Sequence, residues 1–444
     1  MRPSDAGIKG IPRPDERLAG AGSDRADRNY KCTVSMRCAA RPPQRWIATD
    51  LAYLPGRLGG EKGGHGINTF LAAGRMPPYL LRLWQLTRSV GMIGAVHHDF
   101  SDIEVVPRAA LPIRSAEPSA DRGGRPPTVS PPPPGLMRPF WSVMIPIYNC
   151  REDYLRETLR SVLGQDPGIA EMQIEVLDNC STIGDPEAVV REMGGGRIEY
   201  HRQPVNVAII GNFNACIERA RGQWVHILHG DDTVRPDFYS RARAGIAAHP
   251  EVGAALCRTI YIDEDGLWTG LTELEGRTPG VLDGSFAERQ LLDQRIQFVG
   301  IVVRRSTFEE LGGFRSSLPH CLDWDMWKRI ALSKALYYDP EPMACYRVHM
   351  GADSSRLVAT GANVIEERRS IDYSCAALPQ QYAPRVRRAA RRAAGVRALR
   401  RARQLWKNGH HAAAWHQFIE GMRCSLATAV LARSAYFLLR TVVH

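Results

Sequence analysis

The sequence predicts an α/β protein built on an open, mostly parallel, twisted sheet with flanking helices, followed by a helical C-terminal region. Three observations predict this organisation. Short apolar runs alternate with helical patterns over residues 137–360, Pro, Gly and Arg crowd residues 1–136, and residues 361–444 carry helical periodicity alone. We therefore expect three parts with these boundaries.

The first part, residues 1–136, is expected to be a poorly ordered leader. It ends in the run Ser130-Pro-Pro-Pro-Pro-Gly135, and such a run favours extended polyproline conformation. One apolar stretch within 76–96 has helical spacing and predicts a short amphipathic helix. The N-terminus lacks the apolar core of a secretory signal, and we expect the folded protein to begin near Met137.

The second part, residues 137–360, alternates strand and helix patterns in chain order. Apolar or β-branched runs predict strands at 141–147, 173–177, 197–202, 224–228 and 254–262. Helical patterns predict helices at 153–163, 185–193, 211–220 and 236–249. This alternation is typical of a sheet whose strands are joined by crossover helices.

The third part, residues 361–444, is strongly basic. The segment Arg385–Arg403 holds nine Arg and no acidic residue, and a narrow apolar stripe leaves a wide cationic face. Such a face suits an anionic membrane surface, or it is a solvated face of a helix that packs on the second part. Nucleic acid is not expected, because no recognition motif accompanies the charge. No run of 18 apolar residues occurs, so no transmembrane helix is expected.

Composition narrows the class further. The formal charge is +11, from 58 Lys and Arg against 47 Asp and Glu, and the hydrophobic fraction of 44% is ordinary for a globular protein. The ten cysteines form no C-x-x-C pair, which disfavours a structural zinc site or a thiol redox motif. Scattered thiols suit a reducing cytoplasm, and we expect a cytoplasmic protein.

Carboxylates stand where two of the predicted strands end. Asp178 follows one buried strand, and the pair Asp231-Asp232 follows another, WVHIL. Ligands of open α/β sheets bind at the carboxyl ends of the strands, although turn chemistry is the alternative for Asp178. Two adjacent carboxylates repel each other unless a cation lies between them and a diphosphate, and Mg²⁺ has this preference for oxygen ligands. The sequence lacks a Walker A loop and a G-x-G-x-x-G motif, which disfavours a P-loop or a dinucleotide site.

A second acidic motif is Asp323-Trp324-Asp325, at the start of an apolar helical pattern. Aspartates at a helix start are often caps. The functional interpretation is a general base, because an attacking hydroxyl needs a proton acceptor.

These residues resemble family 2 glycosyltransferases with a GT-A fold. The resemblance covers Trp141 to His349 and is carried by six motifs in order: VMIPIYN (143–149), LDNCST (177–182), NVAIIGNFNACIERARGQWVHILHGDD (206–232), FVGIVVRRSTFEELGGF (298–314), LDWDMW (322–327) and YRVH (346–349). It implies an inverting transfer from a nucleotide-sugar donor to a sugar or lipid-linked acceptor, in surface polysaccharide or glycolipid synthesis. It also implies Mg²⁺ or Mn²⁺ as cofactor, and a position peripheral to the inner face of the cytoplasmic membrane through Arg385–Arg403.

The resemblance implies a role for each matching residue. The residues implied in nucleotide binding are Pro146, Tyr148, Asn149, Asp178, Asn212 and Asp231. The implied metal ligands are Asp231, Asp232 and His349. Asp323 matches the family's catalytic base, with Asp325 as the second candidate, while Gly300 and Trp324 would lie beside the acceptor or donor sugar.

Two departures and two alternatives accompany this assignment. Asn206-Val207-Ala208 replaces the usual N-x-G, and Leu322 stands where Glu is usual. A non-catalytic membrane-surface or nucleic-acid binding protein is one alternative. A nucleotidyltransferase is the other, although its first loop usually contains glycine and 148–152 does not.

Overall fold

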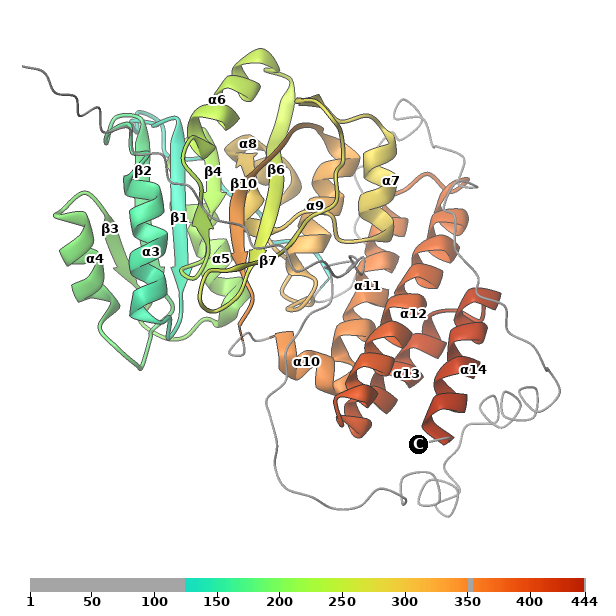
Figure 1. The fold of residues 1–444 in the computed structure, drawn as a ribbon. Coiled ribbons are helices and arrows are strands. Elements are labelled where there is room, and N and C mark those ends of the chain that lie inside the picture. The colour runs from blue at the N-terminus through green and yellow to red at the C-terminus, as the bar shows by residue number, and fades with distance from the viewer. Residues whose placement is uncertain (1–123, 350–353, 443–444) are drawn as a thin grey trace, which may run out of the picture. The chain divides into compact units, whose positions relative to one another are not determined.

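The computed structural model describes residues 124–349 and 354–442 (Figure 1). Residues 1–123 of the predicted leader, with the helix expected within 76–96, lie outside the described residues. The strands are β1 (Trp141–Ile147), β2 (Met172–Asp178), β3 (Glu199–Arg202), β4 (Trp224–Ile227), β5 (Thr233–Val234), β6 (Val252–Ile262), β7 (Trp268–Leu271), β8 (Gly280–Val281), β9 (Ile301–Arg304) and β10 (Ala335–Arg347). The helices of the sheet domain are α3 (Glu152–Leu163), α4 (Pro186–Gly194), α5 (Ala208–Arg219), α6 (Phe238–Ala248), α7 (Ser285–Leu292), the 3₁₀ helix η2 (Phe298–Gly300), α8 (Arg305–Leu311) and α9 (Leu322–Ser333).

One sheet joins the described strands in the order β3-β2-β1-β4-β9-β6-β10-β5, with β7 on β6 and β8 on β10. The long pairs β1–β2 and β6–β10 are parallel, as are β1–β4 and β2–β3. Strand β9 runs antiparallel between β4 and β6 and so joins the two parallel halves. The expected open twisted sheet with flanking helices is therefore present, with an antiparallel strand at its centre.

The helices pack on both faces of the sheet, and β1 shows why. Met144 of β1 packs in a core with residues of α5, α7, α8 and α9. Val143 and Ile145 point the other way, into a core with residues of α3, α4 and α6. Because side chains alternate along a strand, a strand that is apolar throughout is buried on both faces. All seven residues of β1 are buried.

The predicted strands and helices of residues 141–262 are confirmed, with ends that shift by a few residues. The elements that the sequence did not predict are the short strands β5, β7, β8 and β9, the helices α7 and α8, and the long strand β10. Strand β10 pairs with β6 over ten residues of register, interrupted by irregularities near Pro342. Strand β10 was not predicted because its sequence, ALYYDPEPMACYR, contains two prolines, and proline is unusual inside a strand.

The chain reaches the sheet before residue 137. Val129 is 4% exposed and belongs to the core that contains Met144. The carbonyl of Pro127 accepts from the Gly313 amide at 2.8 Å, and the carbonyl of Ser130 accepts from Arg305 at 2.9 Å. Residues that pack on the domain therefore begin before the boundary that we expected near Met137. The reason is that the backbone carbonyls of a Pro-rich segment can accept hydrogen bonds from the domain without forming a helix or a strand.

The helical region that we predicted after residue 360 is present. It contains α10 (Ser354–Thr360), α11 (Ala362–Ala376), α12 (Ala383–Lys407), α13 (His411–Cys424) and α14 (Thr428–Val442). The basic helix α12 packs against α11, α13 and α14 and buries small residues such as Ala394 and Ala398. None of the helices that the structure describes combines the length and apolar character that a membrane crossing requires.

Candidate active site

The acidic pair lies in the loop between β4 and β5, at the carboxyl end of β4. Asp232 is fully buried; its Oδ1 accepts from the Arg347 amide at 2.8 Å, and its Oδ2 is buried without a hydrogen-bond partner. Asp231 is partly exposed and binds Nε2 of His349 through Oδ2 at 2.8 Å. The expected convergence of Asp231, Asp232 and His349 is therefore present in the geometry.

His229, to which the sequence analysis gave no role, completes this cluster. Ligand atoms of His229, Asp231 and Asp232 lie within 4.8 Å of one another. The imidazole is held between Phe213, whose ring centroid is 5.2 Å away, and Phe298, at 4.8 Å. The only sequence signal for His229 was its position two residues before the acidic pair.

The electrostatics of the cluster fit a divalent cation. Burial, and then the charge of Asp231, raises the pKa of Asp232 well above its ordinary value. Burial alone would raise the pKa of Asp231, but the hydrogen bond from His349 holds it below its ordinary value. Burial lowers the pKa of His229, so its ring is a neutral potential ligand. A buried carboxylate oxygen without a partner, next to a second carboxylate and a neutral imidazole, is a donor set that suits Mg²⁺ or Mn²⁺.

Arg347, at the end of β10, fixes the loop that carries the pair. Its Nε donates to the Asp231 carbonyl at 2.9 Å, and its Nη2 binds Glu157 of α3 at 2.5 Å. Gly230 lets the same loop approach β1, because a Cβ at this position would stand 2.6 Å from Ile147. The loop is therefore bonded to β10 through Arg347 and packed closely against β1 at Gly230.

Asp178, at the end of β2, is fully buried and already satisfied by protein donors. It accepts from the Ser181 amide at 2.9 Å, from the Tyr200 hydroxyl at 2.8 Å, and from Arg202. This ion pair forms because β2 and β3 pair in a register that sets Arg202 opposite Asp178. Its role in base binding stays a prediction.

The other residues expected at the nucleotide lie around the same ends of β1 and β2. Pro146 is buried in β1, and Tyr148 is 48% exposed just beyond it. Asn149 joins two loops: its Oδ1 accepts from the Thr182 amide at 2.8 Å. Asn212 is buried and donates to the carbonyl of Leu177 at 3.0 Å, so it supports the end of β2 from α5.

The loop that departs from N-x-G keeps a left-handed backbone without glycine. Ala208 has a φ of 60°, and its amide donates to Oδ1 of Asn206 at 2.9 Å. A non-glycine residue in this conformation costs about 1–2 kcal/mol. The substitution therefore leaves the loop with local strain.

Asp323 and Asp325 differ sharply, although both lie in the first turn of α9. Asp325 is buried, and its Oδ2 binds Arg315 at 3.1 Å and Arg329 at 3.0 Å. Asp323 binds no cation in this way; its Oδ2 accepts from Nε2 of Gln294 at 2.7 Å. Burial raises the pKa of Asp323 to about 6. Of the two predicted candidates, Asp323 is therefore the carboxylate suited to accept a proton near neutral pH.

The charges of both acidic motifs act on Tyr346 of β10. Burial, followed by the charges of Asp232, Asp231 and Asp323, raises the pKa of the Tyr346 hydroxyl. Because β10 was not predicted, neither was this connection between the loop after β4 and the start of α9.

Trp324 and Gly300, the residues predicted to contact a sugar, are both buried and closely packed. Trp324 is 7% exposed, and its Nε1 donates to the carbonyl of Gln290 at 2.6 Å, while its sugar contact stays a prediction. Gly300 is buried, and a Cβ there would stand 2.5 Å from Oγ1 of Thr259. Close packing thus explains this glycine, and its sugar contact stays a prediction.

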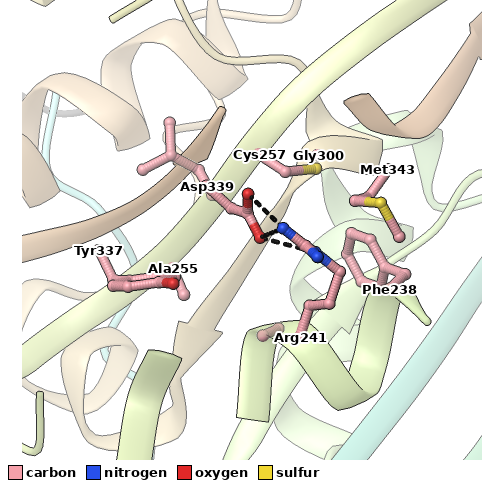
Figure 2. Close-up of a pocket in the computed structure, with 10 residues that line it drawn as sticks. Phe238, Arg241, Ala255, Cys257, Gly300, Tyr337, Asp339 and Met343 are labelled. Carbon is pink, nitrogen blue, oxygen red and sulfur yellow. Dashed lines mark hydrogen bonds and ion pairs between the residues drawn. The ribbon is translucent and has the colours of Figure 1, made fainter. Parts of the chain in front are cut away.

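Gly300 also lines a small pocket between α6, β6 and β10 (Figure 2). Arg241 of α6 and Asp339 of β10 form an ion pair there, with two contacts of 2.9 Å. Apolar side chains, among them Phe238 and Met343, make up much of the remaining wall. The ion pair satisfies the charged groups of this pocket, which contains none of the acidic residues of the cluster above.

Comparison with known proteins places this geometry in a family context. Residues 142–311 match the family model described as Glycosyl transferase family 2. An uncharacterized protein of Mycobacterium tuberculosis is 27% identical over 248 residues, which are 53% of this chain and 76% of that protein. The abequosyltransferase RfbV of Salmonella typhimurium is 36% identical over 98 residues, which are 22% of this chain and 29% of that protein. The crystal structure of S. aureus TarS 1–349 with UDP-GlcNAc aligns with a TM-score of 0.45 at 16% identity, covering 64% of this chain and 91% of that one.

Proposed function

We propose that this chain, which belongs to glycosyl transferase family 2 through residues 142–311, transfers a sugar from a nucleotide-diphosphate donor to an acceptor hydroxyl with inversion. Membership of this family favours the transferase over the nucleotidyltransferase and over the non-catalytic binding protein. One observation carries the proposed site: the buried Asp232 keeps an oxygen without a partner beside Asp231 and His229, at the carboxyl end of a parallel strand.

The acidic cluster would hold Mg²⁺ or Mn²⁺ together with the diphosphate of the donor. Asp231 and Asp232 are the proposed carboxylate ligands, and His229 and His349 stand beside them as nitrogen donors. A divalent cation supplies Lewis-acid stabilisation of the negative charge on a leaving diphosphate. Arg347 and Gly230 keep the two carboxylates in place, so little reorganisation is needed when the donor binds.

Asp323 is the proposed general base. Its pKa of about 6 leaves it largely ionised near neutral pH and still basic enough to accept the proton of an attacking hydroxyl. Asp325 is held by two arginines, which leaves it a positioning role in the first turn of α9. The exposed Tyr148 and the ends of β1 and β2 are the proposed place of the nucleotide, with Asp178 near the base.

The acceptor is proposed to be a sugar, free or lipid-linked, in the synthesis of a surface polysaccharide or glycolipid. Similarity to the abequosyltransferase RfbV supports the transfer of a sugar. The exposed face of α12 supports a contact with the inner face of the cytoplasmic membrane. Within the part of the chain that the structure describes, no carboxylate pairs with Arg388, Arg392 or Arg400. A basic residue near an anionic membrane contributes about 1 kcal/mol.

The site is tested with Asp232→Ala and Asp323→Asn in the full chain. A thermal-shift screen of UDP, GDP, dTDP and their sugar conjugates, with and without Mn²⁺, identifies the donor by its stabilisation. Hydrolysis of that donor is then measured. We expect Asp232→Ala to abolish the Mn²⁺-dependent shift and Asp323→Asn to keep the shift but lose at least ~10²-fold in turnover. Unchanged turnover in both variants refutes the site.

The membrane contact is tested by sedimentation of the full chain with phosphatidylglycerol vesicles. We expect binding at low salt that falls as salt is raised, and that the triple change Arg388→Gln, Arg392→Gln, Arg400→Gln weakens. Arg191→Gln, on the exposed face of α4, is the matched control and should bind like the parent. Equal binding of the triple variant and the control contradicts this part of the proposal.

A further inference from the structure

We infer that the C-terminal helices are part of the transfer site, where Arg397 and Glu366 position the carboxylate of Asp323. This inference rests on the proposed function, because it takes Asp323 as the base. It assigns the region after residue 360 a role that neither its basic composition nor its helical pattern indicates.

Arg397 reaches Asp323 through a continuous series of contacts. From the middle of α12, its Nη1 donates to the carbonyl of Leu292 at 2.7 Å and to Oδ1 of Asp293 at 3.3 Å. The same Oδ1 accepts from the amide of Gln294 at 3.1 Å. The side chain of Gln294 then donates to Oδ2 of Asp323 at 2.7 Å. Arg397 therefore holds the segment whose glutamine orients the base.

The same guanidinium also holds the residue beside the base. It lies 5.0 Å from the centre of the Trp324 ring and pairs with Glu367 of α11. Trp324 in turn donates to the carbonyl of Gln290 in α7. Because the Arg397 side chain is only 12% exposed, these contacts are little screened by solvent. Arg397 thus fixes both the start of α9 and the segment opposite it.

Glu366 fixes the backbone that enters α9. Its Oε2 accepts from the amides of His320 at 2.6 Å and Cys321 at 3.3 Å. The N-cap residue of α9, Cys321, makes no side-chain cap hydrogen bond, and Glu366 of α11 supplies a carboxylate to this end of the helix. A further tie lies one turn later, where the fully buried Lys328 donates to Oγ of Ser370 at 2.6 Å. Contacts between α9 and α11 and between α7 and α12 follow the same boundary (Figure 1).

These contacts matter for catalysis because a general base acts over hydrogen-bond distances. A displacement of about 1 Å can cost about 10²-fold in rate. The direct contacts of Asp323 come from its own helix and from Gln294, and both are fixed from outside by α11 and α12. The helices would therefore affect turnover without touching the donor or the metal cluster.

The experiment compares Arg397→Ala with Arg191→Ala, an exposed arginine of α4 to which no role in catalysis or binding is assigned. Hydrolysis of the donor found by the nucleotide screen is measured over pH 5–8. We expect Arg397→Ala to lower kcat by about 10–100-fold with KM for the donor changed less than about 2-fold. We expect Arg397→Lys to recover part of the loss, since lysine can donate to the Leu292 carbonyl. We also expect the rising limb of the pH profile to move to higher pH, because loss of the Gln294 hydrogen bond raises the pKa of Asp323.

Hydrogen exchange gives a second measurement that needs no activity. Arg397→Ala should speed exchange of the Gln294 amide, and Glu366→Gln should speed exchange of the His320 and Cys321 amides, relative to Arg191→Ala. If Arg397→Ala and Glu366→Gln match Arg191→Ala in kcat and in exchange, the inference is overturned. If Asp323→Asn itself keeps full turnover, the proposed base is wrong, and this outcome is separate from the comparison of the arginines.

Discussion

Replacing Asp323 by Asn should slow the reaction and stabilise the protein, and the stabilisation should depend on pH. The pKa of Asp323 is raised by burial from 3.8 to about 6. At about 1.36 kcal/mol per unit of pKa, the ionised carboxylate costs the folded state up to about 3 kcal/mol. Such a cost at a functional residue is a common exchange of stability for activity.

Proton binding determines whether the stability of the parent rises or falls with pH. Below pH 3.8 the carboxyl is protonated in both the folded and the unfolded chain, and it behaves much like the amide of Asn. Between pH 3.8 and 6 the unfolded chain ionises first, so the parent loses stability as the pH rises through the folded pKa. Asn does not ionise. The difference in free energy of unfolding between Asp323→Asn and the parent should therefore grow by up to about 3 kcal/mol from pH 4 to pH 7.

Urea denaturation of the two proteins at pH 4, 5, 6 and 7 measures this difference. Asp325→Asn, two residues away, is the control with the opposite outcome: it leaves Arg315 and Arg329 without their carboxylate and should cost about 3–5 kcal/mol at pH 7. The rotation of the Gln294 amide toward Asn adds a constant term and does not change with pH. If Asp323→Asn and the parent lose stability in parallel from pH 4 to pH 7, the raised pKa and the reasoning that makes Asp323 the base are both refuted.

Three further outcomes follow from the structure. Ala208→Gly should raise the free energy of unfolding by about 0.5–1 kcal/mol by relieving the positive φ, whereas Ala215→Gly within α5 should lower it by about 1 kcal/mol; a loss in both variants would contradict the strain at Ala208. Val129→Ala in the full chain should lower the free energy of unfolding by about 1–2 kcal/mol; no loss on this change would mean that Val129 is outside the core. Substitution of His229 by Ala should weaken Mn²⁺ binding in calorimetry by about 10-fold or more, and unchanged affinity would remove His229 from the cluster.

The sequence alone was sufficient to predict the strands and helices with strong hydrophobic periodicity. It also identified the residues at the ends of those elements. The run WSVMIPI is apolar except at Ser142 and is typical of a strand buried on both faces. Asp178, Asp231 and Asp232 follow strands of this kind, and the carboxyl ends of parallel strands share one edge of the sheet. Local patterns were therefore sufficient to locate the acidic cluster and the first turn of α9.

Sequence could not show which partner each side chain would meet. Asp178 lies opposite Arg202 only because β2 and β3 adopt one register, and a register shifted by one residue would separate the two. Asp323 and Asp325 look alike in sequence, but Arg315 and Arg329 approach only the second, so the burial that raises the pKa of Asp323 is left uncompensated by an ion pair.

The connection of the helical region to the site was decided by tertiary structure alone. Arg397 sits among other arginines on α12, and nothing in the local pattern separates it from Arg392. Only the packing of α12 on α7 brings its guanidinium to the carbonyl of Leu292, over 105 residues of chain. Contacts of that separation depend on how whole elements pack, whereas the strands, the helices and the acidic loop ends follow from short-range periodicity and turn chemistry.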